Sequence, residues 1–170
     1  VSLAMTSVRG TSTRSAGLVL ASSSFLWTAG SWIQARYSDA WGAPRLVRVG
    51  GATLAVGCVV MAVSLSPDVP VAVWLLGGGL TGLGIGIAYS PLSVVTLGEA
   101  EPGHEGAATS ALQMTDILGI ALGTGLAGVL VTSGERLALE EWQPLVGVFG
   151  MSALVALGVV ALAPRLRRAS

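Results

Sequence analysis

The chain is poor in charged residues. Of its 170 residues, 11% are charged, none is lysine, and 52% are hydrophobic. A soluble domain needs a larger share of charged side chains on its surface, so the composition indicates an integral membrane protein. The formal net charge is zero and basic residues are nowhere concentrated, which argues against a nucleic-acid partner.

Residues that carry catalysis or bind metals are also scarce. The single cysteine, Cys58, lies in an apolar run and can form no internal disulfide. The single histidine, His104, follows a Pro102-Gly103 turn among acidic residues, where a solvated loop is a better interpretation than a metal site. No serine nucleophile can be matched with a histidine base and an orienting acid. We therefore predict no metal site, no cofactor and no enzymatic activity.

What the sequence does contain is long apolar runs between its few charges. Each run is close to or longer than the roughly 20 residues that a helix needs to cross the hydrocarbon of a bilayer. Strict alternation of apolar and polar residues is absent, so helices are favoured over a barrel. We predict an all-α polytopic membrane helix bundle, one transmembrane domain over residues 1–170. Its five expected spans are about 15–35, 48–67, 71–97, 106–133 and 144–164.

Arginines predict the orientation of these spans. With five crossings, the loop carrying Arg36, Arg45 and Arg48 shares a side with Arg165, Arg167 and Arg168, whereas the other side has Arg9, Arg14 and Arg136. The positive-inside rule then places the C-terminus in the cytoplasm of a multi-pass protein of the cell (inner or plasma) membrane. Tryptophans near span ends are expected at headgroup level, with Trp32 and Trp41 inside and Trp74 and Trp142 outside.

One acidic residue, Asp116, lies near the middle of the fourth expected span. A carboxylate is costly in hydrocarbon, so it should face protein or water. On a helix it shares one side with small and polar residues, namely Thr109, Gln113, Gly119 and Gly123. Two interpretations remain open: a protonatable or cation-pairing group in a transport path, or a structural acid held by Gln113, Thr115 or a neighbouring helix.

The third expected span has a face of small residues. Gly78, Gly82 and Gly86 recur every four residues, and Tyr89 and Ser93 continue the same side. Such a pattern predicts close helix packing that opens into a polar patch. With Gly119 and Gly123 proposed as a second packing face, the candidates for a substrate or proton pathway are Tyr89, Ser93, Gln113 and Asp116.

Several motifs, in order, resemble the major facilitator superfamily. The loop from Ile33 to Arg45 contains Asp39, Gly42 and Arg45 in the spacing Asp-x-x-Gly-x-x-Arg, which is similar to the cytoplasmic loop between the second and third helices of each half of these transporters. It departs from the pattern at Ala40, where a basic residue usually follows the aspartate. The runs from Gly82 to Pro91, from Glu101 to Gln113 and from Leu118 to Gly123 are similar to the tenth and eleventh helices of the drug:proton antiporter-like branch.

This resemblance implies that the chain is most of the C-terminal six-helix half of such a transporter. It then corresponds to helices eight to twelve of a twelve-helix protein, or to the equivalent end of a fourteen-helix one. The implied function is proton-coupled export of small molecules or drugs by alternating access. Asp39 and Arg45, with Arg36, would lock or gate the cytoplasmic side, in the positions that the family motif gives them.

The implied partners are the lipid bilayer, a small-molecule substrate, protons and the missing N-terminal half of the transporter. The chain by itself is expected to be a fragment of a longer protein. An alternative function is a non-transporting integral membrane subunit, a scaffold whose glycine faces pack against a partner.

Overall fold

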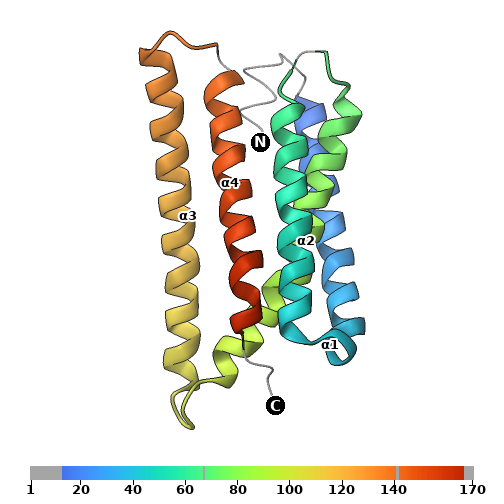
Figure 1. Cartoon of the computed structure of the whole chain (residues 1–170), viewed down its shortest axis with the longest axis vertical. Coiled ribbons are helices and arrows are strands. Elements are labelled where there is room, and N and C mark those ends of the chain that lie inside the picture. Colours follow the sequence, from blue (N-terminus) through green and yellow to red (C-terminus); the bar gives the residue numbers. More distant parts are fainter. Residues whose placement is uncertain (1–12, 67, 141, 167–170) are drawn as a thin grey trace.

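The computed structural model describes residues 13–66, 68–140 and 142–166, and nearly all of these residues are helical. The helices are α1 (Thr13–Val63), α2 (Val71–Gly98), α3 (Glu105–Arg136) and α4 (Trp142–Leu162), followed by the short 3-10 helix η2 (Ala163–Arg165). Figure 1 shows the long helices packed side by side in one bundle. No strand occurs in the described residues, so the predicted all-α class is confirmed.

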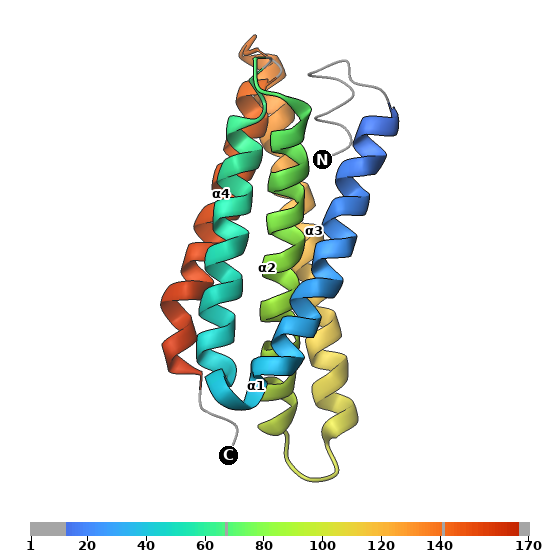
Figure 2. The ribbon, with the colours of Figure 1, turned by 90° about the vertical axis from the view of Figure 1, so that its right-hand side faces the viewer.

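Helix α1 reverses direction at a single glycine. It is 51 residues long, and Gly42 (φ 68°, ψ 162°) is its one residue with non-helical backbone angles. Figure 2 shows the chain turning back at the lower end of the bundle, so that α1 has a first arm (residues 13–41) and a second arm (residues 43–63). Backbone angles of this kind are open almost only to glycine, which lacks the Cβ that would clash.

The predicted number of five spans is not matched. Four helices among the described residues are long and apolar enough to cross a membrane. The expected span 15–35 and most of the span 48–67, up to Val63, fall in α1, because residues 36–47, predicted as a loop, are helical on both sides of Gly42. Residues 64–66 lie in the turn after α1, and residue 67 lies outside the described residues. A straight helix of the length of α1 would extend for about 76 Å, over twice the roughly 30 Å of bilayer hydrocarbon. The other expected spans lie within α2, within α3, and within α4 with η2.

Helix α2 lies between the two arms of α1 (Figure 2), and glycines face both arms. The glycines predicted to form a packing face lie against the first arm; they are Gly78, Gly82 and Gly86. A Cβ on Gly82 would collide with the backbone of Ser23, and one on Gly86 with the carbonyl oxygen of Trp27. Small residues allow helix backbones to approach this closely in a membrane.

The opposite side of α2 meets the second arm in the same way. A Cβ on Gly84 would lie 2.5 Å from the backbone nitrogen of Leu54, and one on Gly50 would lie 2.6 Å from the carbonyl oxygen of Gly84. Buried glycines therefore fill both faces of α2, and the three helical segments form the most tightly packed part of the bundle.

We expect Gly82→Ala to lower the stability of the protein in detergent by about 1–3 kcal/mol, the usual cost of overpacking a core. The new methyl group would lie 2.9 Å from the Cα of Ser23, which is backbone and cannot rotate away. The midpoint of thermal unfolding measures the effect. Gly123→Ala is the matched control, because no described atom lies within 4 Å of its Cβ position. Equal midpoints for the two variants would contradict the close contact.

Trp74 packs inside the bundle, contrary to the prediction that it lies at the lipid headgroups. Its side chain is 0% exposed and is clustered with Val19, Met61 and Leu65. The indole nitrogen donates a hydrogen bond to the carbonyl oxygen of Ser64 over 2.7 Å. The ring of Phe149 from α4 meets it edge-on, with centroids 6.3 Å apart. Because the indole N–H has a protein acceptor, the ring needs no contact with water.

Helix α3 stands at the edge of the bundle (Figure 1) and is scarcely buried. Of its most apolar stretch, 6% is buried within the protein, compared with 50% for α2. Its large exposed apolar side chains are Met114, Ile117, Leu118, Ile120, Leu122, Leu126 and Val129. These side chains are available to lipid or to a further helix.

Candidate functional site

Two of the residues predicted for a substrate or proton pathway are in direct contact. The hydroxyl of Tyr89, from α2, donates a hydrogen bond of 2.6 Å to Oδ2 of Asp116, from α3. Bonds between a hydroxyl and a carboxylate are short and strong when the acceptor is ionised. The pair connects α3, at the edge of the bundle, with the tightly packed α2.

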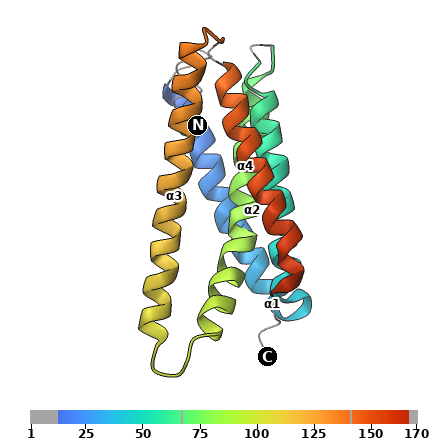
Figure 3. The same ribbon diagram turned by 60° about the vertical axis from the view of Figure 1, so that its left-hand side comes forward.

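A third residue, the aromatic Trp27, which the sequence analysis did not assign to the site, adjoins this pair. The rings of Trp27, from the first arm of α1, and Tyr89 have centroids 6.4 Å apart at an interplanar angle of 53°. Figure 3 shows α3 running beside α2, with the first arm of α1 passing behind them. The signal that could have identified Trp27 is its position inside an apolar run, away from the span ends where tryptophans usually lie.

The other two predicted pathway residues lie one helical turn away from the pair. The hydroxyl of Ser93 donates to the carbonyl oxygen of Tyr89 over 3.1 Å, so this polar group is satisfied within α2. Gln113 is exposed and lies one turn before Asp116 on α3. All four residues therefore belong to neighbouring turns of α2 and α3, and among them the described structure joins the two helices only through Tyr89 and Asp116.

The position of Asp116 along α3 makes its environment chemically important. It follows the first residue of α3 by 11 positions, or about 16 Å along the axis, in a helix that is long and apolar enough to cross a membrane. The side chain is half-buried and Tyr89 is 46% exposed. One oxygen of the carboxylate accepts the tyrosine proton donor. Oδ1 can still take up a proton or accept a hydrogen bond from a cationic or polar ligand.

The residues of the loop motif gather around the reversal of α1. A cavity of about 790 Å³ is lined by Asp39, Gly42 and Arg45 of the motif, and by Pro91, Val94 and Val95 of α2 among others. Arg36 is exposed and does not line it. In the described part of the chain, no ion pair within 4.0 Å involves Arg36, Asp39 or Arg45. The structure therefore brings three of the four motif residues to one cavity, and the charges of Asp39 and Arg45 have no partner among the described residues.

The two groups of glycines predicted for helix packing have different surroundings. Gly82 and Gly86 lie against α1, whereas Gly119 and Gly123 on α3 have no described atom within 4 Å of a Cβ position. The face of α3 that carries Asp116 is therefore uncovered around these glycines by the residues that the structure describes.

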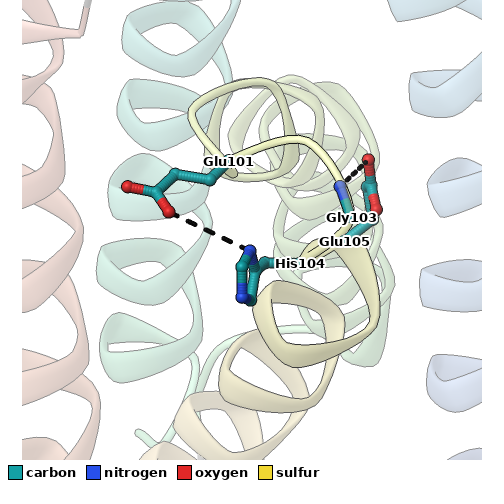
Figure 4. A network of polar contacts seen from close by, with 4 residues as sticks. All are labelled: Glu101, Gly103, His104 and Glu105. Atoms are coloured by element: carbon teal, nitrogen blue, oxygen red, sulfur yellow. Dashed lines mark hydrogen bonds and ion pairs between the residues drawn. The ribbon is translucent and has the colours of Figure 1, made fainter.

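The acidic turn between α2 and α3 is solvent-exposed (Figure 4). His104 Nδ1 lies 3.9 Å from a carboxylate oxygen of Glu101, and Glu105 accepts a 3.1 Å hydrogen bond from the backbone N–H of Gly103. The latter contact stabilises the turn that begins α3, where Glu105 also complements the helix dipole. Across the described ranges, no three His, Cys, Asp or Glu side chains are grouped to hold a metal ion.

Comparison with known proteins identifies the family. The model of the Major Facilitator Superfamily matches residues 1–170. Probable multidrug-efflux transporters from two strains of Mycobacterium tuberculosis are each 31% identical over 150 residues, covering 86% of this chain and 31% of the relative. An uncharacterized MFS-type transporter of Bacillus subtilis, YvkA, is 26% identical over 147 residues, covering 86% of this chain and 33% of the relative.

The chain thus spans about a third of the length of the curated relatives that it matches. The match to the family model extends over all the helices described above, with the loop motif at the reversal of α1 and the Tyr89–Asp116 pair between α2 and α3. The chain belongs to the major facilitator superfamily, as its motifs predicted.

Proposed function

We propose that this chain is part of the C-terminal half of a transporter that exports small molecules or drugs across the cell membrane in exchange for protons. The observation that carries the proposal is the hydrogen bond between Tyr89 and Asp116. The acceptor of this bond, the Asp116 carboxylate, is a protonatable group within a largely apolar helix. Intramembrane carboxylates usually mark ion or proton pathways. The names of the two mycobacterial relatives support an efflux role.

In this mechanism, Asp116 alternates between two states. When it is ionised, it accepts the hydroxyl of Tyr89 and keeps α3 connected to α2. When a proton binds, the carboxyl loses its charge and the bond to the tyrosine weakens, so α3 can separate from α2 more easily. The remaining part of the transporter would cover the exposed face of α3, and alternating access would come from movement of the two halves.

The loop motif is proposed to gate the cytoplasmic side. Asp39 and Arg45 line the cavity beside the end of α2, and within the described residues neither is paired with an opposite charge. Charges from the other half of the transporter would complete these pairs when the cytoplasmic side closes. Arg36, exposed on the first arm, would contribute from outside the cavity.

Dye efflux tests this function in the complete transporter that contains these residues. Cells that express it should export ethidium faster than cells with an empty vector, and nigericin, which collapses the pH gradient, should remove the difference. Unchanged efflux in nigericin would exclude proton exchange. No export of any dye in a panel of cations would favour the alternative of a non-transporting subunit.

We further propose that the bundle crosses the membrane five times, with the two arms of α1 as separate crossings and the C-terminus in the cytoplasm. The charge asymmetry supports this orientation, although three of its arginines, Arg9, Arg167 and Arg168, lie outside the described residues. Gly42 and the turn before α3 would then share the cytoplasmic side.

Cysteine labelling checks the five crossings. In a Cys58→Ser background, Asp68→Cys and Leu137→Cys should react with an impermeant maleimide on intact cells. Ala40→Cys and His104→Cys should react only after the membrane is disrupted. All four positions are exposed, so burial does not limit their reaction. Labelling of positions 40 and 68 from the same side would show that the second arm does not cross.

A further inference from the structure

A second cavity, of about 440 Å³, lies between the second arm of α1 and α4, and it shares Trp41 and Arg45 with the cavity at the loop motif. Its lining residues are Trp41, Arg45, Arg48, Val49, Ala52 and Val160. The two helices are held together beside it, because Gly51 packs on Val160: a Cβ on Gly51 would lie 2.9 Å from Cγ2 of Val160. The cavity is thus bounded by a tight helix contact.

The charged residues that line this cavity are all positive. Arg45 and Arg48 are three residues apart on the second arm, so their side chains are on the same face of the helix. Among the described residues, no carboxylate oxygen lies within 4.0 Å of either guanidinium. The nearest acid along the chain is Asp39, which lines the neighbouring cavity with Arg45. Two adjacent guanidiniums with no counterion among the described residues suit a phosphate, which they can bind through paired N–H donors.

An exposed apolar stripe leads away from the two arginines along the same helix face. Val49, Ala52 and Val56 follow Arg45 at steps of three and four residues, and Val59 and Val63 continue the series. The four valines of this stripe are between 41% and 60% exposed. A ligand that fits both the two arginines and the valine stripe has an anionic head and an apolar tail. The tail is at least about 10 Å long, which is the axial length of the two helical turns that follow the arginines.

Trp41 marks the level of this cavity in the membrane. Its ring lines the cavity and is 37% exposed, as expected for an amphipathic ring at the headgroup level. Helix α4 ends at the same end of the bundle as the reversal of α1 (Figure 1), and Arg165 in η2 adds an exposed positive charge to that end. Basic pockets between transmembrane helices at this level bind lipid headgroups.

We propose that the groove between the second arm of α1 and α4 binds one anionic phospholipid, with its phosphate on Arg45 and Arg48 and an acyl chain along the valine stripe. The charge of the cavity and the continuity of the stripe exclude a purely apolar occupant and favour a lipid over a free anion. The bound lipid would fill the groove and strengthen the contact of α4 with α1.

Native mass spectrometry of the full chain in detergent tests this proposal. Phosphatidylglycerol should remain bound at a stoichiometry of one under conditions that remove phosphatidylcholine. The double variant Arg45→Gln/Arg48→Gln should lower the bound fraction at a fixed lipid concentration at least about tenfold, which corresponds to about 1.4 kcal/mol. Arg36→Gln is the matched control: it removes an exposed arginine from the same end of the bundle but not from the cavity.

Two further measurements make the result decisive. Brominated phosphatidylglycerol should quench the fluorescence of the unmodified protein, and this quenching should be smaller in Trp41→Phe, so that the test does not depend on how the arginine variants fold. Inorganic phosphate should not raise the midpoint of thermal unfolding, whereas phosphatidylglycerol should. Equal binding of phosphatidylcholine, an equal loss in Arg36→Gln, or stabilisation by phosphate alone would each overturn the lipid site. None of these readouts depends on transport.

Discussion

Replacing Asp116 by asparagine is expected to lower the rate of efflux driven by a pH gradient by at least about tenfold, or about 1.4 kcal/mol in activation free energy. Asparagine is nearly the same size and its amide oxygen can still accept the Tyr89 hydroxyl, which lies 2.6 Å from the carboxylate in the native pair. It cannot bind or release a proton near neutral pH. The variant should therefore keep its fold and its substrate binding while it loses the coupling to protons.

Inside-out vesicles that contain the complete transporter allow these effects to be separated. Uphill dye accumulation with an imposed pH gradient should fail in Asp116→Asn, whereas exchange of dye across the membrane without a gradient should continue. Asp68→Asn is the control, since this acid lies in an exposed turn between α1 and α2. Normal uphill accumulation in Asp116→Asn would leave the carboxylate with a structural role only.

Tyr89→Phe distinguishes the two members of the pair. It removes the hydroxyl donor but keeps the ring that lies 6.4 Å from that of Trp27. Uphill efflux should remain at a reduced rate, because the carboxylate is kept while the hydrogen bond that connects α3 with α2 is lost. If Tyr89→Phe abolished uphill efflux as completely as Asp116→Asn, the hydroxyl itself would be required for proton transfer.

Replacing Trp74 by alanine is expected to have the largest effect on stability, a loss of about 3–5 kcal/mol. The side chain is fully buried between α1, α2 and α4, and its removal would leave a cavity lined by Val19, Met61 and Phe149. It would also remove the 2.7 Å hydrogen bond to the Ser64 carbonyl, which ties α2 to the end of α1. Trp74→Phe should lose less, since the phenyl ring retains most of the packing.

The midpoint of unfolding in mixed detergent micelles measures this loss. Trp32→Ala is the control, because that side chain is 69% exposed and its removal leaves no internal cavity. If Trp74→Ala and Trp32→Ala had the same midpoint, Trp74 would behave as a headgroup residue, as its position near a span end suggested.

The comparison of Trp74 with Asp116 shows which features of the structure a local sequence pattern can predict. Asp116 was identified because a carboxylate in an apolar helix needs a polar neighbour wherever that helix lies. Tyr89 was identified from the small-residue face of its own helix. Their contact, however, depends on how α2 and α3 are rotated and placed against each other, and no local pattern contains that information. Trp74 was misplaced for the same reason: whether a ring at a span end meets lipid or protein depends on the helices around it.

The amino-acid sequence by itself determined the helical class, the membrane environment and the family, because these follow from the length and apolarity of the runs and from the order of the motifs. The tertiary structure decided that α1 reverses within a single residue, since only the backbone angles of Gly42 distinguish a sharp turn from an open loop. It also decided which helix faces meet: it placed Asp116 beside Tyr89 and left Gly119 and Gly123 without a neighbour among the described residues. Contacts between distant helices depend on packing over the whole bundle, which local periodicity does not specify.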